Sequence, residues 1–342
     1  MRGECFMAAS IYDVASKAGV SISTVSRAFT RPELVSSKTL SKVLAAANDL
    51  DYSITRAATT MKTGQSFRIA LLLSDAASTW FNSSLIDGID VVLHPAGYDF
   101  SIYRVTNIEE RREFFSTLPV KKNVDAVITA SFGLDAKESE RLASIGVPIV
   151  GINPTSYEGL DASIGVDDRR SATLAADHLI SLGHRRITYV RTNPVSSLHY
   201  SALQREEGFS DACDSSADPI NLRIVTLSDG SDCIDLALTE ILDGKAQPTA
   251  IACQEDNIAM RLLFRLRRYG LDVPKDISLT GFDDSTYAAD AGLTTIHQDP
   301  TVMGSAAARK TLSLLAGNTP APEHDIVPAH LVMRSSTAAP RA

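Results

Sequence analysis

The sequence lacks the patterns that mark several large classes of protein. Its cysteines, at positions 5, 213, 233 and 253, form no CxxC pair and no Cys/His cluster, which argues against a zinc site and a disulfide framework. No apolar run approaches the roughly 18–20 residues that cross a bilayer. Residues 1–7 lack the apolar core of a signal peptide, so we expect a cytoplasmic protein with a disordered leader over residues 1–9. Met7 is an alternative to Met1 as the biological start.

Motifs of common catalytic sites are also missing. The chain contains no GxGxxG and no GxxxxGK[ST], the glycine-rich patterns that bind dinucleotides and nucleoside triphosphates. It contains no GxSxG nucleophile turn and no HExxH zinc motif. We therefore expect neither a cofactor nor a metal.

The charge of the chain is unevenly distributed. The 342 residues are 44% hydrophobic and 22% charged, as in an ordinary soluble protein of two or three domains. Residues 1–66 contain eight Lys and Arg against five Asp and Glu, a net charge of +3, whereas the whole chain carries −8. The remainder therefore carries −11, and a positive head on an acidic body favours a polyanion-binding module joined to a sensing domain.

The head has helix signals at regular intervals. Ser10 can cap a helix that Gly19 ends, and Ser21 can cap a second helix with Val25 and Ala28 on its inner face. Two short helices joined by a glycine-containing turn predict a helix-turn-helix, whose second helix enters the major groove of DNA.

A third helix is expected to follow the helix-turn-helix. It starts at Ser36 and turns Val43, Leu44, Ala47 and Leu50 inward. Spacing alone leaves open a three-helix bundle that has no role in DNA binding.

The amino-acid sequence of the head decides between these alternatives. The segments IYDVASKAGVSISTVSRAF and VSSKTLSKVLAAANDLDY resemble the DNA-binding head of the lactose-repressor (LacI) family, here residues 10–53. The resemblance implies that Ile22, Ser23 and Arg27 choose the bases. Arg27 can bond a guanine bidentately, Ser23 can contact a base or a phosphate, and Ile22 offers an apolar contact to a thymine methyl group. Phosphate contacts are implied for Ser21, Thr24 and Ser36.

Residues 54–66 join the head to the body. Their Thr, Gly and Ser content is typical of a flexible linker. The resemblance instead implies a hinge helix that folds when two copies meet in the minor groove. Ala58 would allow close approach there, and Met61 would insert between base pairs.

The body, residues 67–334, alternates β runs with helical patterns, and residues 335–342 follow as a tail. This alternation predicts an α/β fold with parallel sheets in two Rossmann-like lobes, with ligands at the carboxyl ends of the strands. We expect strands at 69–73, 99–103, 126–129, 149–151, 162–165, 187–190, 223–226, 250–252, 277–280, 294–297 and 326–328. We expect helices at 84–94, 170–182, 203–213, 232–242 and 257–268.

The body also resembles known sensing domains. The segments DHLISLGHRRI, QREEGF, YGLDVPKDISLTGFDD and LTTIHQD are similar to the LacI-family sensing domain and to periplasmic sugar-binding proteins. The resemblance implies a two-lobed, periplasmic-binding-protein-like fold with an effector cleft between the lobes. The cleft positions carried over from it are Trp80, Phe81, His199, Ser201, Arg205, Asp229, Glu255 and Asp283.

These cleft residues suit a small polar ligand. Trp80 can stack on a sugar or a planar base, Arg205 can grip polar groups, and Asp283 can accept hydrogen bonds from hydroxyl groups. Two carboxylates and one arginine favour a sugar or a sugar derivative. A sugar acid held by Arg205 and His199, and a purine stacked on Trp80, are the alternatives.

Together these features predict a DNA-binding repressor of a catabolic operon, controlled by a small effector. We expect a homodimer on double-stranded DNA with a pseudo-palindromic operator and no membrane contact. Whether the effector induces or co-represses stays open. A sugar receptor without a DNA function is the alternative. Paired carboxylates can also hydrolyse sugars, but the attached head favours a protein that is not an enzyme.

Overall fold

The computed structural model describes residues 9–30, 32–52, 64–105, 108–121, 124–131, 133–193, 200–228, 230, 233–243 and 247–341. The chain divides into two compact units, Met1–Phe67 and Arg68–Ala342, which we call the head and the body.

The head is a three-helix unit, as the spacing of its apolar residues predicts. Ser10 precedes α1, and Gly19 closes it with a φ of 66°, a left-handed conformation that glycine adopts without strain. The helices enclose a small apolar core, so the predicted helix-turn-helix and third helix are confirmed. The elements are α1 (Ile11–Ala18), α2 (Ile22–Thr30), η1 (Pro32–Leu34) and α3 (Ser37–Asp49). The buried core residues are Val14, Ala15, Val25, Ala28, Val43, Ala46 and Ala47.

One predicted core residue of the head is wrong. Leu44 is 46% exposed, and Ala46 is buried in its place. Helix α3 buries Val43, Ala46 and Ala47, so its inner face follows a spacing of three and four residues. Position 44 lies about 100° around the helix from position 43, which turns it toward solvent.

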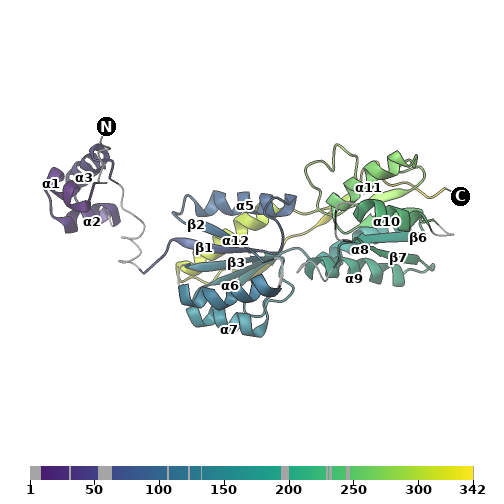
Figure 1. Ribbon diagram of the computed structural model, residues 1–342, viewed down its shortest axis with the longest axis horizontal. Helices are drawn as coiled ribbons and strands as arrows, with labels where there is room; N and C mark the ends of the chain where they lie inside the picture. The colour runs from purple at the N-terminus through teal and green to yellow at the C-terminus, as the bar shows by residue number, and fades with distance from the viewer. Residues whose placement is uncertain are drawn as a thin grey trace. The chain divides into compact units, whose positions relative to one another are not determined.

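The body begins with a lobe built on a parallel sheet, shown in blue and yellow in Figure 1. Its strand order is β11-β5-β4-β3-β1-β2, and every pairing is parallel. These strands are β1 (Arg68–Leu73), β2 (Asp99–Arg104), β3 (Ala126–Ala130), β4 (Ile149–Ile152), β5 (Ala162–Gly165) and β11 (His324–Ile326).

Helices cover both faces of this first sheet. Along β1, Ile69 and Leu71 pack in the core under α5 and α12, whereas Ala70 and Leu72 pack in the core under α6 and α7. Successive side chains of a strand point to opposite faces, so a strand that is buried on both sides is apolar throughout. The helices are α5 (Trp80–Leu93), α6 (Ile108–Lys121), α7 (Ala136–Ile145) and α12 (Pro300–Leu315).

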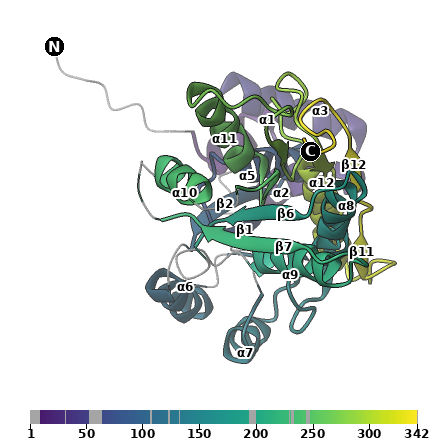
Figure 2. The same ribbon diagram turned by 90° about the vertical axis from the view of Figure 1, so that its right-hand side faces the viewer.

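The second lobe repeats this plan (Figures 1 and 2). Its parallel sheet has the order β7-β6-β8-β9, with α10 and α11 on one face and α8 and α9 on the other. The strands are β6 (Arg186–Arg191), β7 (Asn221–Thr226), β8 (Ala250–Cys253) and β9 (Ser278–Thr280). The helices are α8 (Asp168–Ser181), α9 (Tyr200–Asp214), α10 (Cys233–Leu242) and α11 (Asp256–Arg268). The predicted α/β fold of two Rossmann-like lobes is confirmed.

The chain passes between the lobes more than once. After β5 it enters α8 of the second lobe, and after β10 (Thr295–His297) it returns to α12 of the first. After β11 it leaves again to form β12 (His330–Val332), which pairs antiparallel with β10. Residues 335–341 then stay with the second lobe, where the Ser336 carbonyl accepts a hydrogen bond from the Leu279 N–H at 2.8 Å.

Two features are absent from the described residues. No helix within them is long and apolar enough to cross a membrane. Nor does any cluster of three or more His, Cys, Asp or Glu among them suit a metal ion.

Candidate functional sites

Helix α2 presents the base-choosing residues predicted for the head. Ile22 is 41% exposed, and Ser23 and Arg27 are also exposed, whereas Val25 and Ala28 are buried. The side chains predicted to face DNA and those that hold the helix in place therefore lie on different sides of α2. No rearrangement of the head is needed to bring the outer set to a groove.

Hydroxyl groups cluster at the N-terminus of α2. The Thr24 N–H donates to Ser21 Oγ at 3.2 Å, which confirms the predicted cap. The Ser21 Oγ also lies 2.8 Å from Ser23 Oγ and 2.8 Å from Thr24 Oγ1. Ser23 is thus tied to its neighbour, and Ile22 and Arg27 are the other two exposed side chains that were predicted to choose bases.

A second helix N-terminus in the head is also capped by serine. The Ser36 Oγ accepts the Thr39 N–H at 3.3 Å and donates to Thr39 Oγ1 at 2.9 Å. The partial positive charge at such helix ends suits phosphate groups. The predicted hinge residues Ala58 and Met61 lie outside the described residues.

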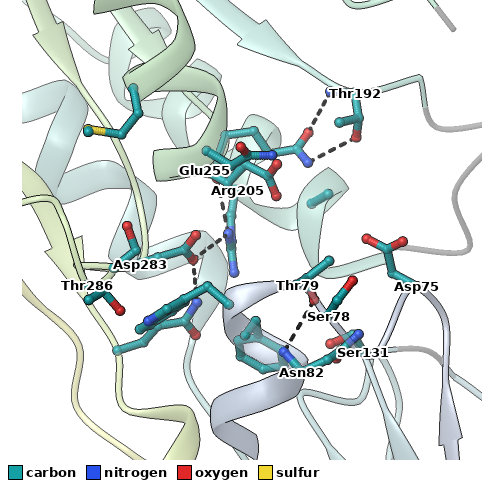
Figure 3. Close-up of a pocket in the computed structure, with 18 of the residues that line it drawn as sticks. Asp75, Ser78, Thr79, Asn82, Ser131, Thr192, Arg205, Glu255, Asp283 and Thr286 are labelled. Atoms are coloured by element: carbon teal, nitrogen blue, oxygen red, sulfur yellow. Dashed lines mark hydrogen bonds and ion pairs between the residues drawn. The ribbon is translucent and has the colours of Figure 1, made fainter. Parts of the chain in front are cut away.

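The body contains a cleft of about 650 Å³ that both lobes line. Figure 3 shows Arg205, Glu255 and Asp283 of the second lobe across the cavity from Asp75, Ser78 and Ser131 of the first. Residues that directly follow strands line the cleft. A crevice is expected there, because ligands bind at the carboxyl ends of the strands in such folds. Those residues are Ser74, Ser131 and Asn153 in the first lobe, and Thr192, Gln254 and Gln298 in the second.

Five of the predicted effector residues line this cleft. They are Trp80, Phe81, Arg205, Glu255 and Asp283. Phe81 also packs against the core of the first lobe. His199 and Asp229 lie outside the described residues, as does the side chain of Ser201.

Arg205 is held rigidly from several sides. It is 7% exposed, and its Nε donates to Asp168 Oδ1 at 2.6 Å. Its Nη1 donates to the Gln254 carbonyl at 3.0 Å and lies 3.6 Å from Asp283 Oδ1. The guanidinium carbon lies 3.7 Å from the centre of the Phe282 ring, a cation–π contact. A buried arginine needs such partners, because an unpaired charge is costly in the interior.

Asp283 belongs to the same network. Its Oδ1 accepts a hydrogen bond from Gln298 Nε2 at 2.7 Å. Burial raises the pKa of Asp283 well above its usual range, Arg205 lowers it, and the charges of Asp256 and Glu255 raise it further. Asp284, the next residue, bonds Arg334 and His297 and so helps to fix the turn.

Two buried polar atoms in the cleft have no hydrogen-bond partner. They are Asn153 Nδ2, in a residue that is 4% exposed, and Gln298 Oε1, in a residue that is 2% exposed. A Cβ at position 165 would lie 2.8 Å from Asn153 Oδ1, so glycine there leaves room for this amide. Unsatisfied buried polar groups cost free energy, which a ligand that bonds them would recover.

The backbone of the cleft is strained at three of its lining residues. Ser131, Asn153 and Asp283 have positive φ values of 66°, 45° and 130°, which non-glycine residues seldom adopt. Such strain persists where the surrounding structure imposes it, and it is frequent in functional sites. The three positive φ values therefore mark the cleft as a candidate functional site independently of any sequence motif.

Sequence reasoning missed part of the site. It did not name Asp168, which orients Arg205, or Asn153, Gln254 and Gln298 in the cleft. Gln298 directly follows the strand predicted at 294–297, and Asn153 and Gln254 come two residues after the strands predicted at 149–151 and 250–252. The rule that ligands bind at the carboxyl ends of strands would therefore have pointed to all three. Asp168 has no comparable signal, because it begins a helix and its partner lies 37 positions away.

The comparisons with known proteins match both the head and the body of the chain. The pattern of "Bacterial regulatory proteins, lacI family" matches residues 10–54, and that of "Periplasmic binding protein-like domain" matches residues 176–337. The chain is 32% identical to the HTH-type transcriptional regulator MalR of Streptomyces coelicolor, over 97% of each protein. The chain belongs to the LacI family.

Solved structures extend this similarity of the LacI-family chain to three dimensions. It resembles the crystal structure of the lac repressor dimer bound to operator and the anti-inducer ONPF, with a TM-score of 0.83 and 25% identity. That match covers 97% of this chain and 100% of the other. It also resembles the complex of the transcriptional regulator CelR with cellobiose, with a TM-score of 0.67, 26% identity, and coverage of 96% and 99%. The protein is therefore a transcriptional regulator of the LacI family.

Proposed function

We propose that this LacI-family regulator is a cytoplasmic repressor of a catabolic operon. It binds double-stranded operator DNA through its head, and a sugar or sugar derivative in the cleft of the body alters its affinity for that operator. The exposed set of Ile22, Ser23 and Arg27 on a helix whose other side is buried is the observation that carries the DNA-binding part. Arg27 reads guanine, and Ile22 contacts a thymine methyl group. Ser21, Thr24 and Ser36 contact phosphates.

The cleft supports the sensing part of the proposal. Its polar groups converge from two lobes that the chain links at several points, so a ligand that bonds both lobes favours one angle between them. Trp80 and Phe81 are the aromatic wall, while Arg205, Glu255 and Asp283 supply polar contacts. We also assign His199, Ser201 and Asp229 to the effector site, because the family resemblance places them at cleft positions. The relative that binds cellobiose supports a carbohydrate.

The regulator acts as a homodimer in this proposal. Val91 on α5 and Val302 on the adjacent α12 are large apolar side chains that the body leaves exposed, and a second copy would cover such a surface. Two heads would then read a pseudo-palindromic operator, with the hinge residues Ala58 and Met61 in the minor groove between the half-sites. Sedimentation velocity measures the mass in solution, and a monomer at micromolar concentration would contradict the dimer.

Two other functions have less support. A sugar receptor without a DNA function has no use for the head, which matches the family pattern over residues 10–54. A glycosidase needs two carboxyl groups free to act on the scissile bond, but Asp283 bonds Gln298 and lies 3.6 Å from Arg205. The relatives are regulators. We therefore propose that the cleft binds its ligand without converting it.

Selection from a randomised DNA library tests the function directly. The purified full-length protein should enrich one pseudo-palindromic sequence, and the Arg27→Ala variant should not. Unfolding curves of the variant serve as the control for folding. The enriched operator then allows candidate sugars, sugar acids and purines to be screened for their effect on the complex. Failure to enrich any sequence would contradict the repressor.

A further inference from the structure

The cleft has a buried end and an open end. Asn153, Arg205 and Gln298 line it at the buried end, where they are 4%, 7% and 2% exposed. Phe264 and Tyr287 also line it, but they are 57% and 68% exposed. A ligand in the cleft therefore meets enclosed polar groups at one end and two aromatic rings at the end that opens to solvent.

The buried end suits a sugar ring. The Gln298 Oε1 atom is an acceptor without a partner, and the Asn153 Nδ2 atom is a donor without a partner. A hydroxyl group both donates and accepts hydrogen bonds, so the hydroxyl groups of one ring can satisfy both amides. Because an unsatisfied buried polar atom costs free energy, these two bonds favour the binding of such a ring.

Helix α11 leads from the buried end toward the open end. The Gln254 carbonyl, just before the helix, accepts a hydrogen bond from Arg205 Nη1 at 3.0 Å. Asn257, Met260 and Phe264 line the cleft, and their spacing of three and four residues puts them on one face of α11. From Asn257 to Phe264 this face runs about 10 Å, at about 1.5 Å per residue. The cleft therefore extends along α11 beyond the length of a single sugar ring.

The open end combines aromatic and polar groups. Asn257 shares its face of α11 with Phe264. Thr286 directly precedes Tyr287, and Figure 3 shows it across the cavity from Asp75. The flat face of an aromatic ring suits the C–H side of a sugar, and amide and hydroxyl groups bond its hydroxyl groups. The open end therefore suits a second sugar ring.

The volume of the cleft is also large for one ring. The cavity measures about 650 Å³. A hexose fills roughly 200 Å³, the volume of about seven liquid waters at about 30 Å³ each. One hexose would thus fill roughly a third of the cavity and two linked hexoses roughly two thirds, and binding sites enclose most of their ligand. The dimensions therefore favour two rings over one.

From this arrangement we infer that the effector is a disaccharide. Its inner ring bonds Asn153 and Gln298 at the buried end, and its outer ring lies against Phe264 and Tyr287 at the open end. The inference rests on the proposed function of the cleft as the effector site. It separates the ligand from single sugars and sugar acids, which leave the open end empty. It also separates the ligand from purines and nucleosides, which carry no second row of hydroxyl groups.

A series of sugars of one and two rings tests the inference with the full-length protein. Trp80 is the single tryptophan of the chain and lines the cleft, so its fluorescence reports binding there. The probes are cellobiose, maltose, lactose, melibiose, trehalose and sucrose, with the monosaccharides that compose them and with adenosine and cytidine. One disaccharide should bind roughly 10- to 100-fold more tightly than either of its monosaccharides, the gain from one aromatic contact and one hydrogen bond together.

Substitutions at the two ends should act differently on one ring and on two. Phe264→Ala and Tyr287→Ala should each weaken binding of the disaccharide and leave the monosaccharide unchanged, because only the outer ring loses a contact. Gln298→Met should weaken both sugars by a similar factor, because each places a ring at the buried end. If Gln298→Met fails to fold, as its melting curve would show, the two exposed aromatic positions still separate one ring from two.

Tyr269→Ala is the matched control. This tyrosine directly follows α11 and is 59% exposed, but it is not among the described residues that line the cavity. The affinities for the disaccharide and for its monosaccharides should both be unchanged in this variant.

The inference is overturned if a monosaccharide or a nucleoside binds as tightly as the best disaccharide, or if no probe changes the fluorescence of Trp80. It is equally overturned if neither aromatic variant lowers the preference for two rings. Sedimentation of these variants then shows whether Phe264 and Tyr287 belong instead to a contact between copies. Operator binding by the same sample without sugar is measured in parallel. Absence of operator binding contradicts the proposed repressor, whereas a preference for single sugars contradicts the disaccharide alone.

Discussion

The head and the cleft hold their functional side chains in opposite ways. In the head, Ile22 and Arg27 are exposed on a helix that Val25 and Ala28 anchor in the core. In the cleft, Arg205 is buried and bonds Asp168 inside its own lobe. Binding and stability therefore depend on different residues in the head and on the same residues in the cleft.

This difference fits the ligands that we propose for the two sites. The DNA groove accepts long side chains from outside, so the head needs a rigid base and exposed ends. A small ligand must be enclosed, which removes water and strengthens each polar contact. Arg205 and Asp283 are accordingly bonded to protein groups in the absence of a ligand, and they are part of the interior.

The largest effect on stability is expected for Asp168, which would show that cleft residues also stabilise the body. Asp168→Ala would leave the buried Arg205 guanidinium without its partner at 2.6 Å. We expect the free energy of unfolding of the body to fall by about 3–5 kcal/mol, the usual cost of removing one partner of a buried ion pair. Urea unfolding followed by Trp80 fluorescence measures it. The control Glu207→Ala removes an exposed partner of Arg169 and should cost less than about 1 kcal/mol. Equal losses in the two variants would break the comparison.

A pH dependence of stability is expected from Asp256, which lies behind the cleft. Burial raises the pKa of Asp256 to about 6, although Thr295 and Ser285 donate hydrogen bonds to it. Because the folded state keeps a proton that the unfolded state has lost above about pH 4, stability falls as the pH rises from 4 to 6. The loss from this group is about 3 kcal/mol and is complete above the folded pKa. Urea unfolding at several pH values measures it, and a profile for Asp256→Asn as steep as that of the wild type would contradict the assignment.

Arg27→Ala should weaken operator binding by about 1–3 kcal/mol per half-site, as expected for a bidentate contact with guanine. The melting temperature of the head should not change, because the side chain is exposed. Binding titrations with operator and with random DNA measure the two affinities. An equal loss on both DNAs would show that Arg27 contacts phosphate rather than a base, and a lower melting temperature would break the contrast with the cleft.

The smallest effect is expected at Ile22. Replacing the contacted thymine by uracil removes one methyl group, which should cost about 0.8 kcal/mol of operator affinity, the value of one buried methylene. In Ile22→Ala the two DNAs should bind equally, because the contact is already lost. A penalty for uracil that persists in this variant would assign the methyl group to another residue.

Much of the fold was predictable from periodicity. The strand predicted at 162–165 matches β5 (Ala162–Gly165), and the one at 69–73 differs from β1 (Arg68–Leu73) by one residue. The strand predicted at 326–328 is displaced, since β11 is His324–Ile326. Both β11 and β12 have three residues, too few for alternation to be visible, and they are held by pairing with β5 and β10. Leu44 was predicted on the inner face of the third helix, but the turn of about 100° between neighbouring helical positions exposes it beside the buried Val43.

The cleft was predictable only in part. Arg205, Glu255 and Asp283 came from matched family positions, and all three line the cavity. Asp168 and Gln298 did not, because their importance lies in bonds to Arg205 and Asp283 across long stretches of chain. A sequence shows which residues follow a strand, but it does not show which of them meet.

By itself the sequence determined the helices of the head, the alternation that makes the body α/β, and the family to which the chain belongs. These depend on local spacing, capping residues and contiguous motifs, all of which are written along the chain. Only the tertiary structure decided that Arg205 is neutralised by Asp168, and that Asn153 Nδ2 and Gln298 Oε1 have no partners. Those facts depend on which distant side chains come within about 3 Å of one another, a distance that folding alone sets.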